Sequence, residues 1–186
     1  MHFFISRGPF PARTHGPSMA FSDNLIEAAE DVLALAKQKD QTIVTAESCT
    51  SGLLASVLSE APGAAELLHG GLVTYTKQNK TVALSVSAEL LRTKGAVCPQ
   101  VACAMAEGAL MRSPATLVVS ITGVAGPSPD EDGNPVGKVC IAVARRGCPT
   151  THLEQDYGDI GRDAVRERAM LDALAALKRA LLVIVC

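Results

Sequence analysis

The sequence predicts an α/β fold, a single layered domain in which a mixed β-sheet is flanked by helices. Runs of β-branched residues alternate with segments whose small apolar residues recur at helical spacing. Residues 115–122 (ATLVVSIT) are almost entirely apolar, which is typical of a strand buried on both faces. Two strand segments follow each other late in the chain across a short turn, and such a hairpin is antiparallel. The sheet is therefore expected to be mixed.

The first half of the chain predicts two helix–strand units. A helix is expected from Ser22, a typical N-cap residue, to about Gln38, because apolar residues share one stripe along it. The elements that follow are a strand over 41–46, a helix over 49–60, a short helix over 64–68 and a strand over 71–76.

The second half predicts the remaining helices and the hairpin. Gly95 is a helix stop signal, and Pro99 is suited to the first position of the next helix. The expected elements are helices over 77–84, 88–94 and 99–112, strands over 115–122, 138–145 and 150–157, and a closing helix over 161–183.

Length and composition predict one domain with an aliphatic core. The chain has 186 residues, of which 48% are hydrophobic but only 3% aromatic, with no Trp. Residues 1–20 differ from the rest, since they contain three Pro, two Arg and no acidic residue. We therefore expect a disordered N-terminal extension over 1–20 and a folded domain over 21–186.

Several classes of function are disfavoured. A net charge of −2 provides no electrostatic footprint for nucleic acid or an anionic membrane, and the longest apolar run, 180–186, is too short to span a bilayer. The six Cys and four His are scattered without metal-ligand spacing, so neither a metal nor another cofactor is expected. Cysteines in this pattern are typical of reduced thiols, which predicts a cytoplasmic protein.

Polar residues gather where three of the predicted strands end. These groups are Glu47-Ser48-Cys49-Thr50, the segment Thr74 to Lys80, and Thr122 to Pro127. Because α/β sheets bind ligands at the carboxyl ends of their strands, the three groups predict a site for a small molecule.

Ser48 is the candidate nucleophile of this site. At a predicted helix N-terminus, unpaired N–H groups would favour negative charge on its oxygen or on an oxyanion. None of the three groups contains a His, which argues against a Ser-His-Asp triad and leaves Lys80 and Tyr75 as candidate bases. Taken alone, Ser48 is more often a helix cap, and Lys80 more often a solvated charge. The coincidence of three polar strand ends favours chemistry.

A set of motifs in consistent order from about residue 22 to residue 182 resembles one known family. They are T-A-E-S-C-T-S-G-L-L-A (45–55), P-G (62–63), G-L-V-T-Y-T-x-x-x-K (71–80), K-G-A-V (94–97), M-A-E-G-A-L (105–110), S-I-T-G-V-A-G-P (120–127), P-V-G-K-V (135–139) and G-R-D-A-V-R (161–166). In these motifs the chain resembles the CinA C-terminal domain family, whose active members are nicotinamide-nucleotide amidohydrolases.

The resemblance implies metal-independent hydrolysis of the carboxamide of nicotinamide mononucleotide to nicotinic acid mononucleotide and ammonia. It implies that Ser48 is the nucleophile and that Tyr75 and Lys80 assist it. A homodimer is also implied. Arg162 or Arg166 is expected to assist in holding the phosphate, and Glu47 to orient a neighbouring group. The substrate-binding residues expected on this basis are Glu47, Thr50, Gly52, Thr122, Gly123, Gly126 and Arg162.

The chain departs from the family pattern at three places. Ser51 stands where the family usually has Gly, residues 76–79 are more basic than usual, and the loop 127–135 carries Asp-Glu-Asp in place of a mostly Gly-rich run. Two alternatives to a serine amidase follow from the residues. One is a nucleotide-binding module that has lost turnover, and the other is an enzyme that uses Cys49 as its nucleophile.

Overall fold

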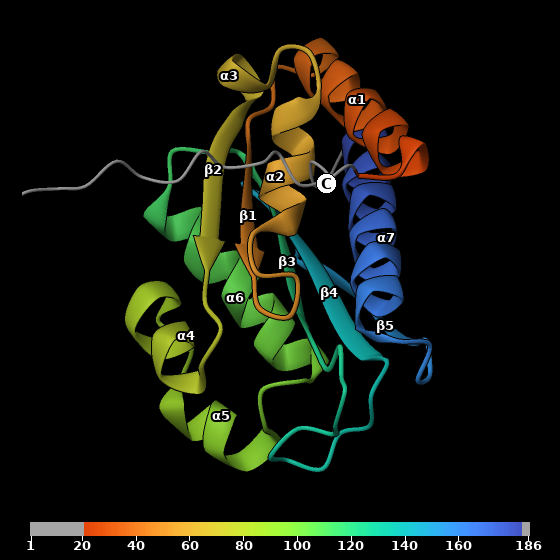
Figure 1. Ribbon diagram of the computed structural model, residues 1–186. Coiled ribbons are helices and arrows are strands. Elements are labelled where there is room, and N and C mark those ends of the chain that lie inside the picture. Colours follow the sequence, from red (N-terminus) through yellow and green to blue (C-terminus); the bar gives the residue numbers. More distant parts are fainter. Residues whose placement is uncertain (1–20, 184–186) are drawn as a thin grey trace, which may run out of the picture.

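A five-stranded mixed sheet forms the centre of the molecule, as a computed structural model of the chain shows for residues 21–183 (Figure 1). The strand order is β2-β1-β3-β4-β5; β1 runs parallel to β2 and β3, and β4 runs antiparallel to β3 and β5. The strands are β1 (Ile43–Glu47), β2 (Leu68–Val73), β3 (Leu117–Gly123), β4 (Lys138–Arg145) and β5 (Thr151–Asp156). The predicted fold class is confirmed, whereas the extension over 1–20 lies outside the described residues.

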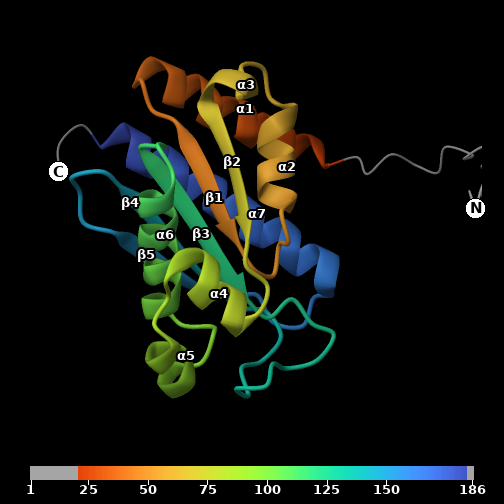
Figure 2. The same ribbon diagram turned by 90° about the vertical axis from the view of Figure 1, so that its left-hand side faces the viewer.

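Helices cover both faces of this sheet. They are α1 (Asp23–Gln38), α2 (Leu53–Glu60), α3 (Ala64–Leu67), α4 (Lys77–Leu84), α5 (Ala88–Lys94), α6 (Pro99–Arg112) and α7 (Arg162–Leu182). One core lies between the sheet and α1, α2 and α7, and a second lies between the sheet and α6, with α4 and α5 beside it. Figure 2 shows α6 and α2 on opposite sides of the sheet.

The central strand β3 joins the two cores. Leu117, Val119 and Ile121 belong to the core under α1, α2 and α7, whereas Val118 belongs to the core under α6. This alternation follows from the two-residue period of a strand. The near-continuous apolar sequence predicted burial on both faces, and the structure confirms it.

Two boundaries differ from the prediction in ways that matter for the site. Helix α2 begins at Leu53 instead of 49, because Ser51 and Gly52 adopt left-handed backbone conformations with φ of 54° and 92°. Strand β2 covers Leu68–Val73 instead of 71–76, because its register with β1 pairs Leu68 with Ile43 and Val73 with Glu47. Residues 48–52 and 74–76 are thus loops that follow the carboxyl ends of the neighbouring parallel strands β1 and β2.

The cysteines only partly follow the expectation of reduced thiols. Cys49, Cys98, Cys103 and Cys140 are free, whereas Cys148 is disulfide-bonded, contrary to the prediction. Over residues 21–183, no helix is both long enough and apolar enough to cross a membrane.

Helix α4 is held against α6 by a close backbone approach. A Cβ atom added to Gly108 of α6 would lie 2.0 Å from the carbonyl oxygen of Leu84, the last residue of α4. No side chain fits there, so the glycine sets the distance between the two helices.

Gly108→Ala tests this contact. Alanine in an exposed helix stabilises it by about 1 kcal/mol relative to glycine, but the clash with Leu84 should dominate. We expect the free energy of unfolding in urea to fall by about 1–3 kcal/mol, the usual range for an overpacked site. A variant as stable as the wild type, or more stable, would contradict this account of the α4–α6 contact.

Candidate active site

A cavity of about 450 Å³ opens at the carboxyl ends of β1, β2 and β3. It brings together residues that lie far apart in the sequence. Of the predicted site residues, those that line it are Ser48, Tyr75, Lys80, Thr122, Gly123, Gly126 and Arg162. Three others, Glu47, Thr50 and Gly52, do not line it.

Ser48 and Lys80 form a direct pair at the base of the cavity. Lys80 Nζ donates one hydrogen bond to Ser48 Oγ at 2.8 Å and another to the carbonyl oxygen of Thr74, also at 2.8 Å. The backbone N–H of Ser48 donates to the carbonyl oxygen of Ile121 in β3, which fixes the serine at the end of the sheet. The residues predicted as nucleophile and base are therefore already within hydrogen-bonding distance.

The Lys80 amine is buried without an opposite charge. The residue is 1% exposed, and no carboxylate among residues 21–183 hydrogen-bonds to Nζ or pairs with it. Burial in a poorly solvated site disfavours the charged form and lowers the pKa of Lys80 from 10.5 to about 8. A useful fraction of this amine is therefore neutral near physiological pH and able to accept a proton.

Glu47 is buried beside the site but serves the backbone of α2. Its Oε1 accepts hydrogen bonds from Thr45 Oγ1 and from the N–H of Ala55, and its Oε2 accepts them from the N–H groups of Gly52 and Leu54. The four distances lie between 2.8 and 3.1 Å, and the residue is fully buried. A negative charge at the start of a helix interacts favourably with its dipole. Glu47 thus fixes the turn 48–52 that carries Ser48.

The same turn changes the role expected of the helix N-terminus. Ser48 does not cap α2, because the turn 48–52 separates the two, and Glu47 already uses the first N–H groups of the helix. Ser51 donates from Oγ to the carbonyl oxygen of Ser48 at 3.2 Å. The Ser51 side chain is exposed and does not line the cavity, so the departure from the usual Gly bears on the turn and leaves the ligand space unchanged.

Cys49 is a poor nucleophile in this arrangement. Burial raises the pKa of its thiol to about 11, although the nearby Lys80 opposes the rise. The thiol is therefore protonated at neutral pH. The Cys49 carbonyl oxygen accepts a hydrogen bond from Arg166 Nε of α7 at 2.9 Å, so Arg166 supports the turn and is absent from the cavity lining.

Tyr75 and Arg162 lie together at the edge of the cavity. The Tyr75 residue is 56% exposed, and its hydroxyl oxygen accepts a long hydrogen bond of 3.4 Å from Arg162. Arg162 also donates to the carbonyl oxygen of Gly126. Thr122, by contrast, donates its hydroxyl to the carbonyl oxygen of Ala96 and so joins β3 to the segment after α5.

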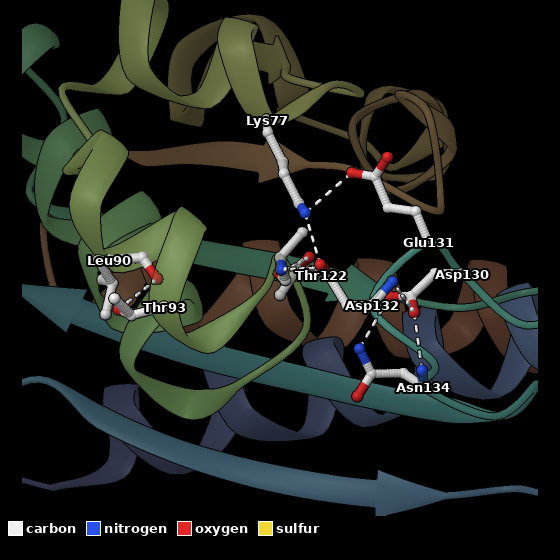
Figure 3. A network of polar contacts seen from close by, with 9 residues as sticks. Lys77, Leu90, Thr93, Thr122, Asp130, Glu131, Asp132 and Asn134 are labelled. Atoms are coloured by element: carbon white, nitrogen blue, oxygen red, sulfur yellow. Dashed lines mark hydrogen bonds and ion pairs between the residues drawn. The ribbon is translucent and has the colours of Figure 1, made fainter.

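The cavity also has a charged wall that the sequence did not predict. Lys77 of α4 and the loop residues Asp130, Glu131 and Asp132 line it, and Figure 3 shows Lys77 pointing toward Glu131 and Asp132. Both segments stood out in the sequence as departures from the family pattern, but nothing there indicated that they meet. Within residues 21–183, no three His, Cys, Asp or Glu side chains gather in a way that would hold a metal ion.

Comparisons with known proteins place the site in a family context. Residues 25–181 match the model of the CinA C-terminal domain. The chain is 44% identical over 155 residues to a "Putative competence-damage inducible protein" of Symbiobacterium thermophilum, and these cover 80% of the chain but 36% of that relative. It is 46% identical over 142 residues to a "CinA-like protein" of Mycolicibacterium gilvum, covering 76% of the chain and 33% of the relative. The chain thus spans about a third of the length of the curated relatives it matches.

Solved structures agree with this match over nearly their full length. The competence/damage inducible protein CihA of Agrobacterium tumefaciens superimposes with a TM-score of 0.83 at 40% identity, covering 88% of this chain and 99% of that one. A competence-damaged protein (CinA) superfamily protein of Escherichia coli gives a TM-score of 0.80 at 32% identity, covering 95% and 100%.

The burial of Lys80 predicts a specific pH dependence of stability. Between the native pKa of about 8 and the ordinary value of 10.5, the unfolded chain binds a proton that the native protein has released. The contribution of this group to the free energy of unfolding should therefore rise with pH across that window, by roughly 3 kcal/mol in total. We expect Lys80→Met to be more stable than the wild type at pH 7, with an advantage that shrinks toward pH 10.5.

Urea unfolding at several pH values between 7 and 10.5 measures this difference. Lys39→Met, at an exposed position, is the matched control for the change of side chain. A constant difference between Lys80→Met and the wild type over this range would show that the amine does not lose its proton early.

Proposed function

Because this chain belongs to the CinA C-terminal domain family, we propose that it is an amidohydrolase that converts nicotinamide mononucleotide to nicotinic acid mononucleotide and ammonia. The observation that supports this proposal best is the contact of 2.8 Å between Ser48 Oγ and the buried Lys80 amine. A serine next to an amine of lowered pKa is a nucleophile with its base in place. The carboxamide is the substrate group implied by the family resemblance.

The proposed reaction proceeds through an acyl-enzyme. Neutral Lys80 accepts the hydroxyl proton of Ser48 while Oγ attacks the carboxamide carbon, giving a tetrahedral intermediate. This intermediate breaks its C–N bond, and the protonated amine gives its proton to the leaving nitrogen, which departs as ammonia. Water then attacks the ester, again with Lys80 as the base. The acid is released, and the Ser48 hydroxyl is restored.

The oxyanion of the intermediate requires donors other than the start of α2, which Glu47 occupies. The backbone N–H of Cys49 follows the nucleophile directly, and Cys49 lines the cavity, whereas Thr50 does not. Within residues 21–183 this N–H donates to no backbone carbonyl. We assign the oxyanion to it, since a donor fixed in place before reaction stabilises developing charge most effectively.

Arg162 is the proposed partner of the substrate phosphate. It lines the cavity, whereas Arg166, the other candidate from the sequence, is bound to the Cys49 carbonyl outside it. The Arg162 guanidinium is held by neutral oxygens of Gly126 and Tyr75, so its charge is available to an anion. Tyr75 lies beside Arg162 at the edge of the cavity and, as the family resemblance implies, assists Ser48. The homodimer and the cytoplasmic location stay predictions.

The roles of Ser48 and Cys49 are separated by substitution. Ser48→Ala removes the group that forms the acyl-enzyme, so we expect kcat for ammonia release from nicotinamide mononucleotide to fall by several orders of magnitude, while the nucleotide still binds. Cys49→Ala should change kcat little per folded molecule, because its thiol is protonated and buried. Loss of turnover in Cys49→Ala alone would instead favour the thiol as nucleophile. A wild type that binds the nucleotide without releasing ammonia would be a binding module.

The pH–rate profile tests Lys80 as the base. Since only the neutral amine accepts the serine proton, kcat/KM should rise with pH and level off above about pH 8, the pKa set by burial. Ammonia release measured from pH 6 to 9.5 gives this profile. If kcat/KM were constant over this range, or fell as the pH rose from acid to neutral, neutral Lys80 would be excluded as the base.

A further inference from the structure

The loop between β3 and β4, residues 124–137, forms the outer wall of the cavity and is fastened by one carboxylate. Asp132 Oδ1 accepts a hydrogen bond from Lys77 Nζ of α4 at 2.6 Å (Figure 3). Asp132 Oδ2 accepts one from the N–H of Ala96 at 3.0 Å. Ala96 lies in the connection between α5 and α6. Asp132 therefore ties together three segments that all contribute to the cavity lining. We refer to Lys77, Ala96 and Asp132 as the latch.

A second acidic residue shapes the loop itself. Asp130 Oδ1 accepts hydrogen bonds from the N–H groups of Asp132 and Asn134, and its Oδ2 accepts one from Asn134 Nδ2. Asn134 Oδ1 in turn accepts from Lys138 Nζ at the start of β4. The turn around Asp130 is thus held within the loop, and Asp132 fastens that preformed turn to the neighbouring helices.

The Asp132 carboxylate of the latch packs closely against its surroundings. A Cβ atom on Gly95 would lie 2.7 Å from Asp132 Oδ2, so the glycine leaves the space that the carboxylate fills. The Lys77 and Asp132 side chains are 30% and 24% exposed, whereas that of Glu131, 2.9 Å from Lys77 Nζ, is 74% exposed. Exposed ion pairs contribute little, so Asp132 is the carboxylate on which the contact chiefly depends. Its hydrogen bond from Lys77 lowers the pKa of Asp132.

The two ends of the latch are the same segments that set this chain apart from its family pattern. Lys77 belongs to the unusually basic stretch 76–79, and Asp132 to the unusually acidic loop 127–135. They lie 55 positions apart and meet in one hydrogen-bonded ion pair. We propose that Asp132 is a positioning residue, which holds the loop 124–137 as a fixed wall of the substrate cavity through Lys77 and Ala96. As far as substrate is concerned, this inference rests on the proposed function.

The latch acts on binding and leaves the chemistry alone. The side chains of Lys77 and Asp132 make no hydrogen bond or ion pair with Ser48 or Lys80. A free loop samples positions in which the cavity is open, and the energy to close it is then drawn from substrate binding. Breaking the latch should accordingly raise KM with little change in kcat.

Hydrogen exchange of the substrate-free protein is the first test, because it needs no activity. Asp132→Asn keeps an acceptor for Ala96 but removes the charge, and Lys77→Met removes the cation. Each should speed exchange of the amides in 128–136 by about tenfold or more, since local opening becomes easier. Asp31→Asn is the matched control, because Asp31 and Lys178 form a similar ion pair at 2.7 Å between α1 and α7. Unchanged exchange in both latch variants would overturn the proposal.

Steady-state kinetics with nicotinamide mononucleotide is the second test. We expect KM to rise about tenfold in both Asp132→Asn and Lys77→Met with kcat changed less than about twofold, and Lys77→Arg to restore KM. The shared direction is decisive because the two variants change the charge of the cavity in opposite senses. If Asp132→Asn lowered KM while Lys77→Met raised it, the residues would act only as charges on an anionic substrate, and the positioning role would be overturned. If the wild-type protein released no ammonia, only the proposed function would be contradicted. Hydrogen exchange would still test whether Asp132 and Lys77 hold the loop 124–137.

Discussion

The burial of a lysine amine without a counter-ion is the constraint on which the rest of the site depends. Lys80 is almost completely buried, and its two hydrogen-bond acceptors, Ser48 Oγ and the Thr74 carbonyl, are both neutral. A carboxylate in either place would stabilise the ammonium form and so remove the proposed base. The surroundings of α4 maintain this burial: Thr76 caps its first turn by accepting from the N–H of Asn79, and Gly108 lets its last turn approach α6. The low pKa of the amine thus follows from how α4 is packed.

Glu47 shows how an acid can sit next to such a base without neutralising it. It is the neighbour of Ser48 in the chain, yet strand alternation places its side chain with Thr45 on the α2 face of β1. There its two oxygens accept four hydrogen bonds from α2 and Thr45. This accounts for most of the acceptor capacity of a carboxylate. The carboxylate is stabilised by the start of the helix and forms no ion pair with Lys80. The alternation of side chains along β1 therefore directs Glu47 toward α2 and leaves Lys80 without a carboxylate partner among residues 21–183.

Much of this arrangement was predictable from the residues, but the features that depend on where a side chain points or on the local backbone conformation were not. Apolar runs and helix stops predicted the elements, and three polar strand ends predicted a site whose residues Ser48, Tyr75 and Lys80 line one cavity. Glu47 was expected to bind substrate or orient a group, because a carboxylate after a strand has the same sequence signal whichever way it points. The start of α2 was misplaced since Ser51, a residue without the usual left-handed preference of glycine, adopts φ of 54°. The contact of Lys77 with Asp132 has no local signal, because long-range ion pairs leave no periodic pattern.

The departures from the family pattern fall in two places, the turn that carries Ser48 and the outer wall of the cavity. Ser51 strains the nucleophile turn slightly, but its hydroxyl returns a hydrogen bond to Ser48 and its side chain stays outside the cavity. The basic stretch after β2 and the acidic loop after β3 change the outer wall, and they do so as a matched pair. Lys77 pairs with Asp132 and Glu131, so the cation of the basic stretch lies beside two carboxylates of the acidic loop. No side chain of the basic stretch or of the acidic loop hydrogen-bonds to Ser48 Oγ or Lys80 Nζ. Two of the three departures therefore lie in the outer wall of the cavity, and the third lies in the turn that carries Ser48.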